Sequence, residues 1–137
     1  MTTARVDWAG GLRFVGEADS GHLVIMDARS QEGEDPGACT PVEATLIALC
    51  ACSGVDVVSI LRKMQAPPRA MSVSAEAKRS TEHPKVFTEI RLKFHIEGDV
   101  PEGKARRAVD LSEDTYCSIR AMLGATATIT HEIEIVP

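Results

Sequence analysis

The sequence predicts an α+β protein with the element order βββ–α–ββ–αα–β. Apolar and polar residues alternate in residues 4–28, and turn residues interrupt the alternation twice, which is typical of a three-stranded meander. A long apolar stretch with helix start and stop signals follows at residues 40–64. Alternation returns in residues 70–79, 86–98 and 126–136, and segments with helical spacing separate the last two of these strands.

The composition limits the classes of function. The chain has 137 residues, of which 44% are hydrophobic, and this is enough for the core of a single domain over residues 1–137. The net charge is −5, only 4% of the residues are aromatic and no basic block occurs, so we expect no nucleic-acid partner. The longest apolar run is too short and too interrupted to span a bilayer, and the first residues lack a signal-peptide pattern. We therefore expect no membrane association and a cytoplasmic protein.

The long helix has clear start and stop signals. Thr40 is its expected N-cap, with Pro41 at the first helical position and Glu43 at the third, which together form a capping box. The helix should end near Met64, before two prolines, and measure about 35 Å. Its first half, residues 42–52, is apolar on every side, so we expect a long buried central helix. Because a domain of this size cannot easily enclose such a helix alone, we expect a partner subunit.

The strand at residues 86–98 shows a clear period of two. In this pattern Val86 shares the apolar face with Ile90 and the alternate residues that follow it. Phe87 then falls on the opposite face, together with the charged residues.

Two helical segments are expected between the last two strands. Residues 101–114 have helical spacing of small and apolar residues at Ala105, Ala108 and Val109, so this helix should pack by one face. Residues 116–124 read as a short second helix that ends in a glycine.

Four cysteines raise the question whether any of them is a working thiol. No Cys-x-x-Cys pair occurs, so we expect no zinc site, no other metal and no cofactor. We interpret Cys39 as incidental and Cys50 as a core residue, since free cysteine is among the most buried residue types. Cys50 and Cys52 point about 200° apart on a helix and cannot bond to each other without unwinding it. Cys52 and Cys117 are each followed by serine, and their separation in sequence leaves open whether they touch.

The two remaining cysteine motifs resemble those of the OsmC/Ohr family. The stretch TPVEATLIALCACSGVDVVSILRKM is similar to the family's Ser/Thr-Pro-x-Glu opening and its Cys-[Ser/Thr]-x-x-Asp-Val-Val core helix. The stretch YCSIRAML is similar to the family's second cysteine motif, Tyr-Cys-x-[Val/Ile]. The stretch GLRFVGEADSGHLVIMDA resembles the N-terminal hairpin of OsmC-like proteins of the YhfA type. The element order also matches the family fold, so the resemblance covers essentially the whole chain.

The resemblance implies a fold, a partner and a reaction. The family's fold is an intertwined homodimer in which two long central helices are wrapped by the sheets of both subunits. Cys52 matches the peroxidatic cysteine of organic hydroperoxide reductases, and Cys117 matches the resolving cysteine. In that reaction a thiolate reduces an organic hydroperoxide, a Cys52–Cys117 disulfide forms, and an external dithiol reduces the disulfide.

This chemistry needs an activated thiol, and here the sequence departs from the peroxidases. Cys52 lies too far into its helix for the N-terminal dipole to matter, so a cationic partner is required. In the peroxidases this partner is an arginine near the N-terminal hairpin, held by a glutamate directly after the proline that opens the helix. Arg13 is the candidate here, although strand alternation predicts a solvated residue equally well. Val42 occupies the position of that glutamate, and for Glu43, one residue later, we favour the capping role.

Two further residues could act near these motifs, and two functions stay open. His22 could be a base or an orienting group, although a turn histidine that bonds to the backbone is the favoured interpretation. Asp56 lies one turn after Cys52, where its negative charge would oppose thiolate formation. The two cysteines favour a peroxidase of organic hydroperoxides. Val42 favours the alternative, a non-peroxidatic OsmC-like protein that binds a small apolar ligand or responds to redox state.

Overall fold

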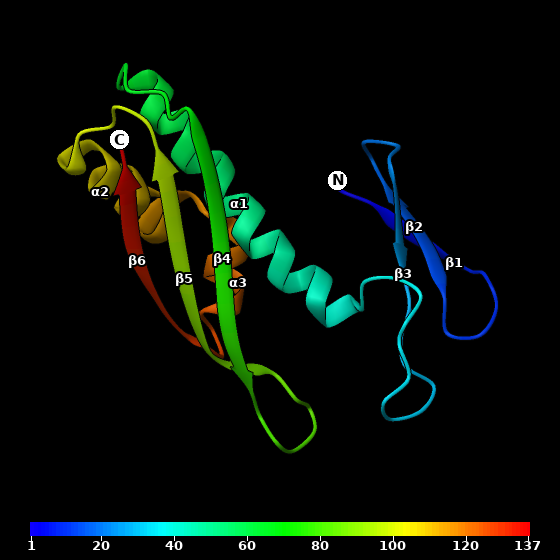
Figure 1. The fold of residues 1–137 in the computed structure, drawn as a ribbon. Helices are drawn as coiled ribbons and strands as arrows, with labels where there is room; N and C mark the ends of the chain where they lie inside the picture. The colour runs from blue at the N-terminus through cyan, green and yellow to red at the C-terminus, as the bar shows by residue number, and fades with distance from the viewer. The chain divides into compact units, whose positions relative to one another are not determined.

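The computed structural model describes all residues from 1 to 137 and contains two compact units, Met1–Ile47 and Ala48–Pro137. The order of strands and helices along the chain is βββ–α–ββ–αα–β, with one π-helical turn between the last two helices. The predicted fold class and element order are therefore confirmed (Figure 1).

The N-terminal unit is built on the expected meander. Strands β1 (Ala4–Trp8), β2 (Phe14–Ala18) and β3 (Leu23–Met26) pair antiparallel in the order β1-β2-β3. The first turn contains two consecutive glycines with φ of 92° and 57°, values that side chains with a Cβ avoid. The turn chemistry in the sequence therefore fixes the register of the hairpin.

The three-stranded sheet leaves large apolar side chains in contact with solvent. Trp8 is 70% exposed, Leu23 66% and Val6 58%, and no residue of the three strands is fully buried. Isolated surface hydrophobes are normal, whereas contiguous exposed apolar side chains mark an interaction surface or a binding groove.

Helix α1 (Pro41–Lys63) begins and ends close to the predicted residues. The backbone N–H of Glu43 donates to Thr40 Oγ1 at 3.2 Å, and the Thr40 N–H donates to Glu43 Oε1 at 3.0 Å, which confirms the capping box. At the other end Gln65 adopts a φ of 59°, and the Ala66 N–H reaches back to the Leu61 carbonyl at 2.9 Å. This is a Schellman-type stop in which a glutamine takes the place of the usual glycine.

Within a single chain, α1 is buried along one stripe only. Leu49, Ser53, Val57 and Leu61, spaced four residues apart, are each fully buried. The residues between them are half-buried or exposed, with Val55 69% exposed. Burial of the helix on every side therefore stays a prediction that needs a second chain.

The expectation that no segment is apolar enough to span a bilayer is wrong. Helix α1 is long and apolar enough to do so by length and composition. The core helices of globular proteins meet the same criterion, so one such helix is weak evidence for a membrane span.

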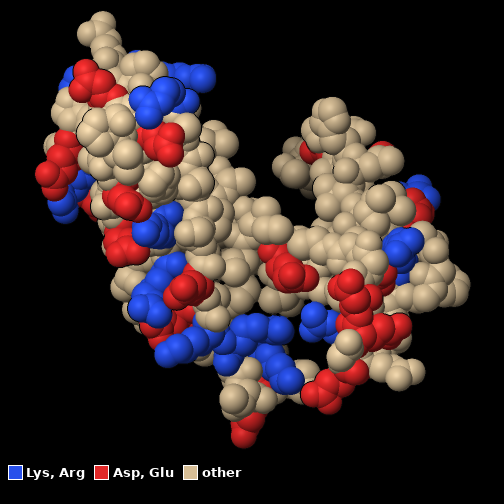
Figure 2. Space-filling model, viewed as in Figure 1, with Lys and Arg blue, Asp and Glu red and all other residues tan.

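The C-terminal unit contains a second sheet, with strands β4 (Ala70–Arg79), β5 (Phe87–Glu97) and β6 (Thr128–Val136) in the order β4-β5-β6. Strand β4 pairs antiparallel with β5, and β6 pairs parallel to β5. The alternate apolar residues of β5 are almost fully buried and form the core of the unit: Ile90, Leu92, Phe94 and Ile96. The opposite face carries interspersed acidic and basic side chains, several of them paired across strands (Figure 2).

One predicted side-chain orientation in β5 is wrong. Phe87 is 8% exposed and joins the core, whereas Val86 is 38% exposed. The pairing explains the exchange: Lys78 lies opposite Glu89, but the next residue of β4, Arg79, lies opposite Phe87. Thr88 is therefore an extra residue in a β-bulge, and such an insertion reverses the in–out alternation beyond it.

The connection between the parallel strands β5 and β6 is helical. It consists of α2 (Glu102–Leu111), a π-helical turn (Ser112–Tyr116) and α3 (Ser118–Leu123). These helices and the adjoining part of α1 lie on one face of the β4–β5–β6 sheet (Figure 1). A Cβ on Gly54 would lie 3.5 Å from the side chain of Val73, an ordinary van der Waals distance, so α1 packs directly against β4 here.

Candidate functional site

The candidate site lies in the C-terminal unit, where α1 meets the connection between β5 and β6. Cys52 comes from the middle of α1. Cys117 follows the π-helical turn and has an extended backbone, with φ −74° and ψ 101°. Its N–H donates to the Ser112 carbonyl at 2.8 Å, which closes the wide π turn. Single π turns inside helices occur often at functional sites, and this one sets the direction of the Cys117 side chain.

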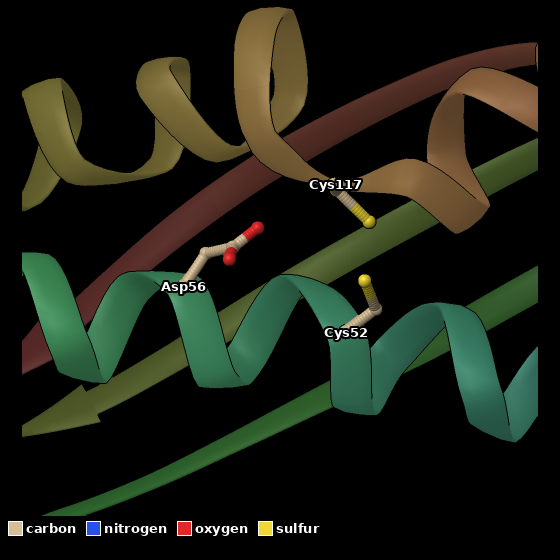
Figure 3. Close-up of side chains that lie close together, drawn as sticks. All are labelled: Cys52, Asp56 and Cys117. Atoms are coloured by element: carbon tan, nitrogen blue, oxygen red, sulfur yellow. The ribbon is translucent and has the colours of Figure 1, made fainter. Parts of the chain in front are cut away.

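The structure brings the two sequence-predicted cysteines together. The sulfur atoms of Cys52 and Cys117 and a carboxylate oxygen of Asp56 all lie within 4.8 Å of one another. The sulfurs point toward each other across the space between α1 and the connection (Figure 3). Both cysteines are free thiols; Cys117 is only 4% exposed, and Cys52 is half-buried. The two thiols are therefore close enough to form a disulfide after a small movement.

A buried hydrogen-bond network supports Cys117 from the side away from solvent. The hydroxyl of Ser53, which is fully buried, lies 3.1 Å from Glu113 Oε1 and 3.4 Å from Cys117 Sγ. The other oxygen of Glu113 accepts from Arg120 Nε at 3.2 Å, in an ion pair with the carboxylate almost fully buried. One series of contacts therefore links the thiol of Cys117, the hydroxyl of Ser53, the carboxylate of Glu113 and the guanidinium of Arg120.

The surroundings of Cys117 favour its neutral form. Burial raises the pKa of the Cys117 thiol above its usual range, and the neighbouring Cys52 adds to that effect. Hydrogen bonds from Ser53 and from the Arg120 backbone N–H, each at 3.4 Å, work against it by favouring the thiolate. Desolvation is the largest of these causes, so Cys117 is a neutral thiol held in place by polar contacts.

Asp56 has its own support. The Ser112 hydroxyl donates to Asp56 Oδ2 at 2.9 Å, which links α1 to the first residue of the π-helical turn. Since Asp56 lies one helical turn after Cys52, both side chains project from the same face of α1. The carboxylate is thereby held beside the two thiols (Figure 3).

The other sequence-predicted site residues lie in the N-terminal unit. Arg13 forms an ion pair with Asp27, with Nη2 and Oδ2 3.3 Å apart. Glu43 is engaged in the capping box, and that contact with Thr40 lowers the pKa of its carboxyl. His22 is exposed at the start of β3. Whether any of these three approaches Cys52 stays a prediction.

The same unit contains an apolar groove. Most of its lining comes from β1, β2 and β3 and the loops beside them. The apolar lining residues are Val6, Leu12, Phe14, Val24, Met26, Ala28 and Pro41.

The polar residues of the network were not singled out from the sequence. Ser112 is fully buried and Glu113 is 5% exposed, although both resemble surface residues at a helix end. A signal was available, because steps of four residues from the buried Ala108 and Val109 lead directly to Ser112 and Glu113. Continuing the buried stripe by one turn would have placed both residues on the inner face.

The fold and the facing thiols together define an α+β protein with two free thiols that meet between α1 and the connection from β5 to β6. A family model described as "OsmC-like protein" matches residues 33–132, and the chain belongs to this OsmC family. The family resemblance of the cysteine motifs is thus confirmed.

Individual relatives agree with this assignment. The chain is 42% identical over 134 residues to Protein YhfA of Escherichia coli strain K12, covering 97% of each chain. A hypothetical protein from Aquifex aeolicus VF5 has a similar structure, with a TM-score of 0.82, 27% identity and coverage of 100% of this chain and 98% of that one. An organic hydroperoxide resistance protein OsmC from Legionella pneumophila shares the fold, with a TM-score of 0.72, 17% identity and coverage of 98% and 96%.

Proposed function

We propose that this protein is a thiol-dependent peroxidase that reduces organic hydroperoxides, with Cys52 as the attacking residue and Cys117 as the resolving residue. The observation that carries the proposal is the approach of the two sulfurs to within 4.8 Å from distant parts of the chain. The Legionella protein of the same fold, described as an organic hydroperoxide resistance protein, adds support.

The proposed reaction has three steps. The Cys52 thiolate attacks the terminal oxygen of the peroxide, the O–O bond breaks, and the alkoxide leaves as an alcohol after taking a proton. The resulting Cys52 sulfenic acid condenses with the Cys117 thiol, which forms the S–S bond and releases water. An external dithiol then reduces the disulfide by thiol–disulfide exchange and is itself oxidised to a disulfide.

Burial supports the assignment of roles to the two thiols. Cys52 is half-buried, so a peroxide can reach it, whereas Cys117 is only 4% exposed. The pKa of Cys117 is raised by burial, which suits a thiol that waits for the sulfenic acid rather than one that attacks first. A disulfide requires a sulfur separation of about 2.05 Å, so the pair needs to close by only a few ångströms.

We also propose that the working form is an intertwined homodimer. The N-terminal sheet has no buried residue, and much of α1 outside its buried stripe is accessible in the single chain. A second copy of the chain would cover these apolar surfaces, at a gain of about 25 cal/mol per Å² of apolar area removed from water. In such a dimer Arg13, His22 and Glu43 are the candidates for groups that reach Cys52 from the partner. A cytoplasmic location is part of the same proposal, because the reaction consumes thiols that must be kept reduced.

The enzyme proposal is tested with reduced, purified protein, cumene hydroperoxide and dihydrolipoate as the dithiol. We expect wild-type protein to consume the hydroperoxide and Cys52→Ser to lose this activity. Cys117→Ser should retain the first turnover but accumulate a sulfenic acid that a dimedone-type probe traps at Cys52. Cys50→Ser is the matched control, since it removes a thiol from the same helix outside the pair, and it should retain activity.

The apolar groove of the N-terminal unit favours a second candidate function, the binding of a small apolar ligand without peroxide chemistry. If wild-type protein consumes no hydroperoxide, or if Cys52→Ser consumes it equally fast, the enzyme proposal fails. Binding of a fluorescent fatty-acid probe that is lost in Phe14→Asp, but not in Cys52→Ser, would then support the alternative.

A further inference from the structure

A third side chain, that of Asp56, lies beside the two thiols and has no role in the proposed peroxidase reaction. Asp56 projects from the same face of α1 as Cys52, and its carboxylate lies within 4.8 Å of both sulfurs (Figure 3). Its carboxylate places a negative charge beside the two sulfurs. The same charge is favourable for a cation.

We propose that Cys52, Cys117 and Asp56 form a binding site for a thiophilic divalent cation, with Zn²⁺ as the best-fitting ion. The proposal goes beyond the peroxidase function and does not rest on it, because it concerns the reduced protein in the absence of any peroxide. It also departs from the expectation drawn from the missing Cys-x-x-Cys motif. That expectation considered ligands that are close in sequence, and this cluster joins residues of α1 to the connection between β5 and β6.

The donor set fits zinc better than it fits hard cations. Zn²⁺ is bound by thiolate at about 2.3 Å and by carboxylate at about 2.0–2.2 Å, whereas Mg²⁺ and Ca²⁺ take oxygen ligands. In a tetrahedral site with these bond lengths the ligand atoms lie roughly 3.5–3.8 Å apart. The cluster, spread over no more than 4.8 Å, needs to contract by about an ångström at most. Three protein ligands leave a fourth position open to solvent or to another ligand, as Cys52 and Asp56 are only half-buried.

Hydrogen bonds already hold two of the three ligands. Ser112 Oγ donates to one oxygen of Asp56 at 2.9 Å, which leaves the other oxygen available for a cation. The Ser53 hydroxyl and the Arg120 N–H lie 3.4 Å from the sulfur of Cys117 and fix its position. Such outer contacts orient ligands and commonly change metal affinity by about 10–100-fold when removed. The Arg120 guanidinium forms an ion pair with Glu113 beside the cluster.

The test is a titration of reduced, metal-free protein with Co²⁺ under anaerobic conditions, followed by displacement with Zn²⁺ in the presence of a chromophoric chelator. We expect one Co²⁺ per chain, with a thiolate-to-cobalt charge-transfer band and the visible bands of tetrahedral cobalt. Asp56→Asn, which keeps an oxygen that accepts from Ser112, should weaken zinc binding by at least 10–100-fold, and Ser112→Ala by about 10–100-fold. Cys52→Ser and Cys117→Ser should each remove part of the charge-transfer intensity.

Cys39→Ser and Cys50→Ser are the matched controls, because both remove a thiol outside the cluster, and both should bind as wild type does. Circular dichroism of each variant shows that it is folded. The proposal is overturned if wild-type protein gives no charge-transfer band, if the band depends on Cys39 or Cys50, or if Asp56→Asn binds zinc with unchanged affinity. No peroxide is added, so loss of metal binding and loss of peroxidase activity are separate results.

Discussion

Removal of the Ser53 hydroxyl tests how much the buried network beside Cys117 contributes to stability. The hydroxyl lies 3.1 Å from Glu113 Oε1 and 3.4 Å from Cys117 Sγ, and no part of Ser53 is exposed. Ser53→Ala removes both contacts and leaves one oxygen of a buried carboxylate without its partner. The second oxygen keeps its bond to Arg120.

The magnitude follows from these contacts. A buried hydrogen bond to a charged group contributes about 1.5–3 kcal/mol, while the contact to sulfur is long and adds little. Alanine is the better helix former by about 0.5 kcal/mol, which offsets part of the loss. We therefore expect Ser53→Ala to lower the free energy of unfolding by about 1–2.5 kcal/mol.

Ser59→Ala is the matched control, since Ser59 is an exposed serine of the same helix and gains the same helix propensity. Urea unfolding of both variants at one protein concentration measures the difference, which should be about 1.5–3 kcal/mol in favour of Ser59→Ala. The contact with Ser53 also lowers the pKa of Cys117, so its loss should slow alkylation of Cys117 at a given pH. If Ser53→Ala is as stable as Ser59→Ala, the network carries no net stability and our reasoning about it is wrong.

Three further predictions concern the scaffold. Thr40→Ala should cost about 1 kcal/mol of stability, measured by urea unfolding, because it removes the N-cap of α1. Phe94→Ala should cost about 3–5 kcal/mol in the same assay, since Phe94 is fully buried in the core of the C-terminal unit. Hydrogen bonds to Glu134 and Glu97 raise the pKa of His95, so the protonated form stabilises the folded state. The stability difference between wild type and His95→Gln should be largest between about pH 5 and 6.5 and disappear as pH rises through the raised pKa; a difference that does not change with pH contradicts this.

The elements that local chemistry determines could be predicted closely. The start of α1 depends on Thr40, Pro41 and Glu43, which are adjacent in sequence, and the capping box forms as expected. The turns of the meander likewise depend on their own glycines. The stop of α1 was placed within a residue, although the left-handed Gln65 that makes it was not foreseen.

Features that depend on pairing between distant segments could not be predicted in this way. The bulge at Thr88 depends on the register between β5 and β4, and no pattern within the sequence of β5 indicates it. The cysteines were selected by family resemblance, and the sequence left open whether they meet. Their approach depends on the π-helical turn before Cys117 and on the close packing of α1. Local patterns therefore determine the elements, while tertiary packing creates the site.

The charged groups near Cys52 and Cys117 affect peroxide reduction and zinc binding differently. Glu113 is neutralised by Arg120, whereas Asp56 is held by the uncharged hydroxyl of Ser112. At 4.8 Å, the Asp56 carboxylate opposes a negative charge on the Cys52 sulfur by about 1 kcal/mol at the dielectric constant of water and by about 3.5 kcal/mol at an effective value of 20. Because Cys52 is half-buried, the lower figure is the better guide.

Asp56→Asn should therefore move the two activities in opposite directions. Loss of the Asp56 charge should speed the alkylation of Cys52 by about two- to threefold, because Asp56 then no longer opposes negative charge on the attacking sulfur. Peptide mass spectrometry after timed iodoacetamide treatment measures this rate, with the exposed Asp114→Asn as a control for net charge. The same variant should bind zinc more weakly. Slower or unchanged alkylation of Cys52 would mean that Asp56 does not act on the thiol through its charge.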